Sequence, residues 1–237
     1  EIAETGHRAL KPFRFLGHVF ARLLKGQFYM AVYTLGQVLP NWLLCCNKAW
    51  LMCTESFRFP EREYPLVRIW LANESDVDDI VRVSGVSRKR VLYLLESGAR
   101  CYLASAGDAP PSSINWCING HCFIRGMGFE HDFEQDSVYG FWSLTLPEFQ
   151  KRGLHFALLA ERTRIERARG IRRFYGIVES HNELSFNMRT RLGFVPVATI
   201  SFLRVLCLRI CVVRDAQTRE SSVRIFVREP RGDVVMI

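Results

Sequence analysis

The apolar and polar positions near the N-terminus follow the period of a helix. Residues 13–24 place apolar side chains on one helical face, and basic side chains from Arg14 to Lys25 follow on another. Residues 26–47 then carry no charge, and these 22 residues approach the length of a membrane span. Because Pro40 interrupts this stretch, we expect two or three short helices there rather than one long helix.

The pattern changes after residues 55–64, which are charged and punctuated by proline and therefore indicate a boundary. Beyond them, period-two alternation and short apolar runs predict strands, and a spacing of three to four predicts helices. The predicted strands are 66–71, 100–106, 114–118, 122–125, 137–146, 174–178 and two within 195–213. The predicted helices are 76–84, 87–96, 153–169 and 183–192. We therefore expect a mixed α/β domain over residues 61–237 and a helical extension over residues 1–60.

Composition fits this division. The chain has 237 residues, of which 49% are hydrophobic, so it can bury a sizeable core and is not disordered as a whole. Its net charge of +8 is uneven, because residues 1–60 carry +4, residues 121–150 carry −4 and residues 151–191 carry +6. A nucleic-acid domain usually shows a continuous basic face with interleaved aromatic residues. The concentrated block at 151–191 instead favours a phosphate-rich small molecule, and no nucleic-acid partner is expected.

Residues 144–155 leave a strand, form a turn and open a helix within the basic block. The first N–H groups of a helix lack intrahelical acceptors and lie at the positive end of the helix dipole, which suits an anion. Gly153 permits a ligand to approach the backbone closely, because no Cβ stands in the way. Gln150, Lys151 and Arg152 add donors and positive charge beside it. This combination predicts a pyrophosphate site.

At these residues the sequence resembles the GCN5-related N-acetyltransferase (GNAT) superfamily. The family's pyrophosphate signature is Gln or Arg, two residues, Gly, one residue, then Gly or Ala. The matching positions are Gln150, Gly153 and His155. A second family element is Asn, a small residue three later, and Gly-Phe eleven and twelve later. It matches Asn182, Ser185, Gly193 and Phe194. The resemblance covers residues 66–213 and is specific over residues 144–194.

The resemblance implies a GNAT-like acyl-CoA N-acyltransferase fold, α/β (α+β), with a mixed, mostly antiparallel sheet. It implies direct transfer of an acetyl or other acyl group from acyl-CoA, as co-substrate, to an amine. The strand at 144–146 would supply the backbone donor for the tetrahedral oxyanion. The residues implied to bind the cofactor are Leu144, Thr145, Leu146, Gln150, Lys151, Arg152, Gly153, Leu154, His155, Asn182 and Ser185. Asn182 and Ser185 are equally well explained as a helix cap.

Two positions depart from the family pattern. His155 replaces the small residue at the end of the loop, where an imidazole would either crowd the pyrophosphate or donate to it. Arg189 stands where many members place a Tyr that protonates the leaving thiolate. Either another group or water then serves as acid, or activity is lost and the chain is a CoA-binding or regulatory module.

The attacking amine must be neutral, so an enzyme of this kind needs a base. Four side chains are candidates, Glu130, His131, Glu134 and His181, of which His181 and Glu130 are our choices. Each is also explained as a solvated surface group. The arginines at 162, 164, 167 and 169 are expected on a solvated helix face. Cys117, His121 and Cys122 lack the paired spacing of a zinc site, so we expect no metal.

The expected acceptor is the amine of a small molecule or peptide. The N-terminal stripe leaves three interpretations open: packing on the acyltransferase domain or on a second subunit of a homodimer, contact with a membrane surface through residues 13–50, or a true span. The second interpretation would fit an enzyme that uses a longer acyl chain or a lipid-linked acceptor. No signal peptide is expected. We expect a cytoplasmic protein, with membrane-surface association left open.

Overall fold

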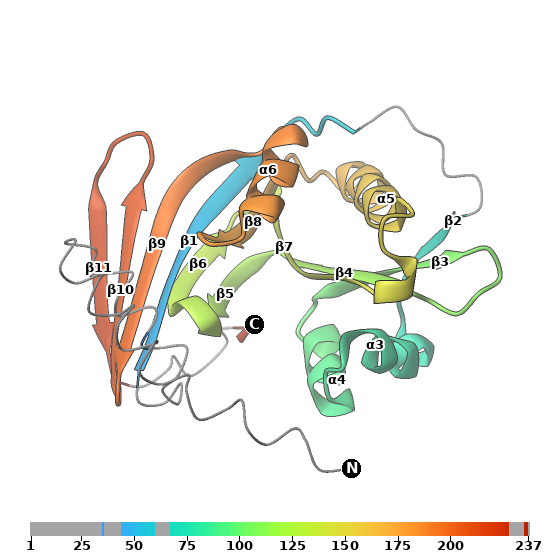
Figure 1. Ribbon diagram of the computed structural model, residues 1–237, viewed down its shortest axis with the longest axis horizontal. Helices are drawn as coiled ribbons and strands as arrows, with labels where there is room; N and C mark the ends of the chain where they lie inside the picture. Colours follow the sequence, from blue (N-terminus) through green and yellow to red (C-terminus); the bar gives the residue numbers. More distant parts are fainter. Residues whose placement is uncertain (1–34, 36–43, 60–66, 228–234, 237) are drawn as a thin grey trace, which may run out of the picture.

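The computed structural model describes residue 35 and residues 44–59, 67–227 and 235–236, and within these ranges two sheets and four α-helices form the fold (Figure 1). In spatial order, the large sheet contains β11 (Ser221–Phe226), β10 (Leu208–Asp215), β9 (Val195–Val205), β1 (Leu44–Thr54), β8 (Arg173–Glu179), β7 (Ser137–Thr145), β4 (Ser113–Ile118), β3 (Arg100–Ala106) and β2 (Val67–Leu71). The small sheet contains β12 (Val235–Met236), β5 (Gly120–Ile124) and β6 (Phe129–Phe133). The helices are α3 (Val77–Ser84), α4 (Arg88–Glu96), α5 (Leu154–Ala168) and α6 (Glu183–Arg191).

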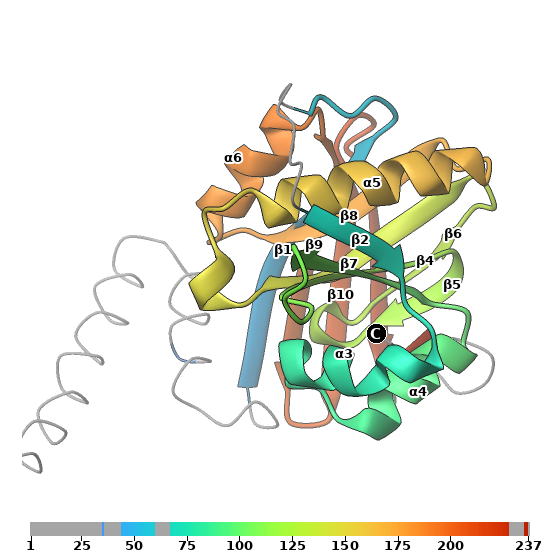
Figure 2. The ribbon, with the colours of Figure 1, turned by 90° about the vertical axis from the view of Figure 1, so that its right-hand side faces the viewer.

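The large sheet separates two layers. Helices α5 and α6 cover one face, and α3 and α4 cover the other (Figures 1 and 2). Neighbouring strands of this sheet are antiparallel, except that β7 and β8 run parallel. Parallel neighbours need a crossover connection, and α5 supplies it. The mixed, mostly antiparallel α/β fold predicted from the sequence is therefore confirmed.

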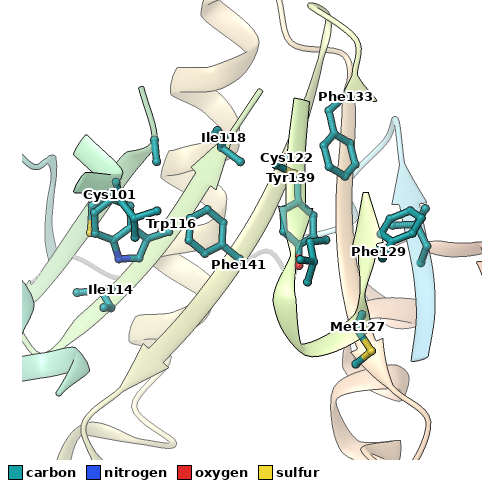
Figure 3. Packing of buried hydrophobic residues seen from close by; sticks show 14 of the residues in the cluster. Cys101, Ile114, Trp116, Ile118, Cys122, Met127, Phe129, Phe133, Tyr139 and Phe141 are labelled. Atoms are coloured by element: carbon teal, nitrogen blue, oxygen red, sulfur yellow. The ribbon is translucent and has the colours of Figure 1, made fainter. Parts of the chain in front are cut away.

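The core has two parts because side chains alternate across the sheet. In β3, Cys101 and Leu103 pack toward α3 and α4, whereas Tyr102 and Ala104 pack toward α5. An aromatic row then joins the large sheet to the small one. Trp116 stacks on Phe141, and Tyr139 stacks on Phe133 with ring centroids 5.1 Å apart (Figure 3). This row fixes the small sheet against the strands that carry the candidate site.

Strand β1 corrects the helical interpretation of residues 1–60 for the part that the structure describes. Leu44–Thr54 pairs with β8 on one side and β9 on the other, so it lies inside the sheet. A strand covered on both faces forms an almost continuous apolar run, and periodicity alone does not distinguish such a run from a buried helix. The other structural predictions for residues 1–34, 36–43 and 60–66 lie outside the described residues. Contact of the N-terminal region with a membrane or a second subunit stays a prediction.

The elements predicted within the described domain are confirmed with small shifts at their ends. Asn73 forms a capping box just before α3, and Gly85 follows the helix with φ +69°. The sequence interpretation missed β6, β11 and β12, which are short or exposed strands. Within the described ranges, none of the helices has the length and apolarity needed to cross a membrane.

Candidate functional site

Strands β7 and β8 pair over only part of their length. The parallel register runs from Ser137 opposite Arg173 to Gly140 opposite Gly176 and then stops, although β7 continues to Thr145. On the other edge of β7 the pairing with β4 continues to Thr145. Beyond Gly140, the edge of β7 that faced β8 therefore lacks a strand partner among the described residues, and its N–H and C=O groups are available to a ligand.

A β-bulge explains why β7 leaves β8. Phe141 pairs with Trp116 and Leu144 pairs with Ile114, so two residues of β7 stand opposite one residue of β4. One of the two, Trp142, has φ +41°, which is rare for a bulky residue. Bulges bend the strand that carries them and increase its twist, and they are common next to active sites. The bulge thus opens the sheet at the end of the parallel pair.

The predicted pyrophosphate loop lies between the open end of β7 and the start of α5 (Figure 2). Its backbone turns sharply, because Lys151 has φ +61° and Gly153 has φ +85°. The Gln150 side chain donates to the carbonyl of Thr145 at 3.1 Å and closes the base of the loop. At the N-cap, Gly153 offers no side chain to the first N–H groups of α5. Those donors are therefore free for an anion, as the sequence predicts.

The side chains of Lys151 and Arg152 are exposed at this helix N-terminus. Arg152 lies over the ring of Phe149, with Cζ 5.5 Å from the ring centroid. Two mobile cations beside free N–H groups add attraction for a phosphate without imposing one geometry. The loop residues predicted from the sequence are thus brought together at one end of α5.

A cleft of about 520 Å³ lies where the two strands separate. Its walls come from β7, β8, α5 and α6, and three of the predicted cofactor residues, His155, Asn182 and Ser185, line it. Asn182 also caps α6, since its side chain accepts from the Ser185 N–H at 3.0 Å. The cap explanation for Asn182 and Ser185 is therefore confirmed, and their place in the cleft lining keeps cofactor contact as a proposal.

His155 directs its imidazole into this cleft. Nδ1 lies 3.2 Å from the Ser143 hydroxyl on the bulged part of β7. Burial first, and then the positive charges of Arg189 and Arg162, together lower the pKa of His155 to about 4. The imidazole is therefore neutral at physiological pH. The residue that departs from the family loop pattern thus contributes a neutral hydrogen-bonding group to the cleft.

Arg162 corrects the prediction of a solvated arginine face on α5. Its exposed fraction is only 3%, and Nη1 donates to Asn115 Oδ1 at 2.6 Å, opposite the β-bulge. Arg164 is exposed and paired with Glu161, as expected. The signal that marks Arg162 is its spacing of four from Leu158, which places it on the buried face of the helix. The sequence interpretation did not use this spacing.

Arg189 of α6 reaches the same cleft. Burial lowers its pKa to about 10, with Tyr139 acting against that shift and Arg162 adding to it. Its guanidinium lies over the Phe194 ring at 5.1 Å. The side chain that replaces the expected Tyr is thus a second cation in the cleft.

The candidate bases lie in different places. His181 pairs with Glu179 at 3.2 Å, and Glu179 lines the cleft, so this pair is at its rim. Glu130 is held by His121 at 2.7 Å and by Arg224, and it is not part of the cleft lining. His181 itself is thus outside the cleft lining but is paired with a residue of it, whereas Glu130 has no such link.

The other two candidates belong to the region of the small sheet. His131 stacks between aromatic rings, and burial lowers its pKa. Glu134 pairs with Arg173. Neither lines the cleft. Within the described residues, no three potential metal ligands lie close enough together to form a site.

Replacement of Arg189 by glutamine is expected to raise the pKa of His155. One neighbouring cation is removed, but burial continues to lower the pKa, so the value should stay below the ordinary 6.5. Titration of the ring signals by NMR, assigned with the His155→Gln variant, measures the shift. The Arg191→Gln variant is the control, because Arg191 lies on the same helix but is exposed. An unchanged His155 pKa in Arg189→Gln would contradict the proximity of the two side chains.

The sheet and the loop define a class of fold. The chain has a mixed, mostly antiparallel α/β fold with one parallel strand pair, a crossover helix that follows a glycine turn, and a cleft where the pair separates. In sequence comparisons, no family model and no curated protein matches the chain. Solved structures that resemble it in fold include proteins named as acetyltransferases.

Three of these structures illustrate the likeness. A GNAT-family acetyltransferase from Novosphingobium aromaticivorans is 16% identical, with 66% of this chain and 62% of that chain covered and a TM-score of 0.49. A GCN5-related N-acetyltransferase from Kribbella flavida is 14% identical, with 72% of this chain and 62% of that chain covered and a TM-score of 0.48. The ribosomal-protein-S18-alanine N-acetyltransferase from Escherichia coli is 14% identical, with 54% of this chain and 76% of that chain covered and a TM-score of 0.44. The chain thus spans less than two thirds of the first two proteins, and at these identities the likeness is one of fold.

Proposed function

We propose that the chain is an acyl-CoA-dependent N-acyltransferase. The observation that carries the proposal is the position of the free N–H groups of α5 beside the cleft that opens between β7 and β8. A pyrophosphate at residues 150–155 would leave the rest of the cofactor to extend along the unpaired edge of β7. Hydrogen bonds to backbone groups at such an edge are the usual way in which a strand binds an extended ligand.

The strand also provides the element that acyl transfer needs most. Attack of an amine on a thioester forms a tetrahedral oxyanion, and a fixed N–H donor stabilises it. The edge of β7 beyond Gly140 would present such a donor at Thr145, because the backbone groups of its neighbour Leu144 face β4 instead. We assign the other cofactor contacts to the loop residues and to Asn182 and Ser185 across the cleft.

For the base we favour His181 over Glu130. A carboxylate beside an imidazole orients it, and Glu179, which lines the cleft, stands in that relation to His181. A Glu130 carboxylate that is already bound by two basic side chains is a poor proton acceptor. The acceptor is then an amine of a small molecule or a peptide that reaches the rim.

The proposal is tested by incubating the full chain with acetyl-CoA and a panel of amines. We expect release of the CoA thiol that depends on the amine, together with an acylated product detected by mass spectrometry. Binding of CoA without turnover on any acceptor and with any acyl group tried would instead favour a CoA-binding module. That second candidate rests on Arg189, which stands where the resemblance places a Tyr as the acid for the leaving thiolate.

A further inference from the structure

Two guanidinium groups lie over a pair of glycines in the cleft. Gly140 of β7 and Gly176 of β8 are register partners at the end of the parallel pair. A Cβ at Gly140 would lie 2.7 Å from Arg162 Nη1, and one at Gly176 would overlap the Arg189 guanidinium. Each glycine thus leaves room for one arginine, and the two arginines are neighbours because adjacent strands are about 4.8 Å apart.

These two cations have no acidic partner of their own among the described residues. Arg162 donates to the neutral Asn115, and its Nε has no hydrogen-bond partner there. The nearest buried acid, Glu166, lies one helical turn away and uses both carboxylate oxygens, at 2.7 Å each, to bind Arg100. Arg189 contacts an aromatic ring and no carboxylate.

The cleft lining contains one acid, and it is already engaged. Glu179 is exposed and pairs with His181 at the rim. A buried charge without a partner is costly, and a pair of like charges is more so. Arg162 is buried and Arg189 is half-buried, so an anion in the cleft would stabilise both side chains.

On the basis of the proposed acyltransferase function, we infer that Arg162 and Arg189 bind a carboxylate carried by one of the two substrates. The donor would then be a CoA thioester of a dicarboxylic acid, or the acceptor would be an amino acid with a free α-carboxylate. Both sources present the same planar group, which matches the guanidinium fork. Apolar cleft walls such as Phe141, Ile177 and Val178 favour a carboxylate over a strongly hydrated phosphate.

Arg162 is held at the strands rather than at the pyrophosphate loop. It lies eight residues beyond Leu154, the first residue of α5, which is roughly 12 Å along the helix axis. Its guanidinium packs on Gly140 and donates to Asn115. We therefore place the carboxylate beside these two residues.

The test compares substrates that differ in one carboxylate. Calorimetry and thiol release are measured with succinyl-CoA against butyryl-CoA, and with glycine against glycinamide as acceptors of acetyl-CoA and of succinyl-CoA. We expect at least about a tenfold advantage, either in affinity or in kcat/KM, for the carboxylate-bearing member of one pair. The donor pair and the acceptor pair distinguish the two sources.

Variants then assign the preference to the arginines. Arg189→Gln should remove most of the preference for the carboxylate-bearing substrate, while its affinity for free CoA stays within about twofold of wild type. Arg191→Gln, on the exposed side of α6, should change neither the preference nor the CoA affinity. Arg162→Gln is measured in parallel, and circular dichroism shows whether each variant folds. Normal CoA binding with no carboxylate preference in either pair would overturn the inference and leave the proposed function standing. Failure to bind CoA at all would refute the proposed function, and the inference with it.

Discussion

Replacement of Gly153 by glutamate is expected to abolish CoA binding while the fold survives. The substituted carboxylate would stand at the N-terminus of α5, where the first N–H groups and Lys151 are arranged for an anion. Two unit charges 4 Å apart repel by about 4 kcal/mol at an effective dielectric constant of 20. A loss of affinity of more than about 100-fold follows, and isothermal calorimetry with CoA measures it.

The matched control separates charge from backbone strain. Gly153 has φ +85°, so any L-residue there is strained, and Gly153→Ala carries the strain without the charge. Both variants should lose roughly 1–2 kcal/mol in the free energy of unfolding. Only Gly153→Glu should lose CoA binding, with Gly153→Ala retaining affinity within several fold. Unchanged CoA affinity in the folded Gly153→Glu variant would refute the pyrophosphate assignment.

This loop is the part of the site that the sequence could predict, because its signal is local. Residues 144–168 run continuously from a strand end, through a turn with three polar or basic residues and one glycine, into an amphipathic helix. Helix α5 begins one residue after Gly153, as the glycine turn predicts. Capping residues and glycine stops likewise placed the ends of α3 and α6 to within two residues. Local chemistry of this kind needs no knowledge of distant partners.

The cleft could not be predicted, because it depends on pairings between distant segments. The end of the β7–β8 register at Gly140 and Gly176 depends on a bulge opposite Asn115, and no single segment encodes that relation. Strand β1 enters the sheet between β8 and β9, which are joined in sequence through α6. Its apolar run fits a buried strand or a buried helix equally well, so only the partners on either side decide between them.

The buried face of α5 was only partly predictable from the sequence, unlike the loop, which was predictable, and the cleft, which was not. Leu154, Leu158, Arg162 and Glu166 recur at a spacing of four, and all of them are buried. A basic and an acidic residue in an apolar stripe indicate a buried polar network, because such residues rarely lose solvent without partners. The sequence contained this signal, and the density of arginines nearby obscured it. The network that it marks has a measurable effect on stability.

Replacement of Glu166 by alanine is expected to reduce the free energy of unfolding by roughly 3–5 kcal/mol. Glu166 is fully buried and accepts two hydrogen bonds of 2.7 Å from Arg100, one from the Tyr102 hydroxyl and a longer one from Arg169. Burial alone would raise its pKa, but the bonds from Arg100 and Tyr102 outweigh burial and lower it. Removing this carboxylate leaves the half-buried Arg100 without its acidic partner and the buried Tyr102 hydroxyl without its acceptor. Chemical denaturation at neutral pH measures the loss.

The control for this substitution lies on the same helix. Glu161 pairs with Arg164 at the surface, so Glu161→Ala should cost no more than about 1 kcal/mol. Because the pKa of Glu166 is lowered in the folded state, its carboxylate stabilises the fold above its ordinary pKa of 4.5, and that contribution is lost as the pH falls below this value. The difference between wild type and Glu166→Ala should therefore narrow in acid, whereas the Glu161→Ala difference stays small throughout. Equal effects of the two substitutions at neutral pH would show that the Glu166 carboxylate does not stabilise the fold through Arg100 and Tyr102.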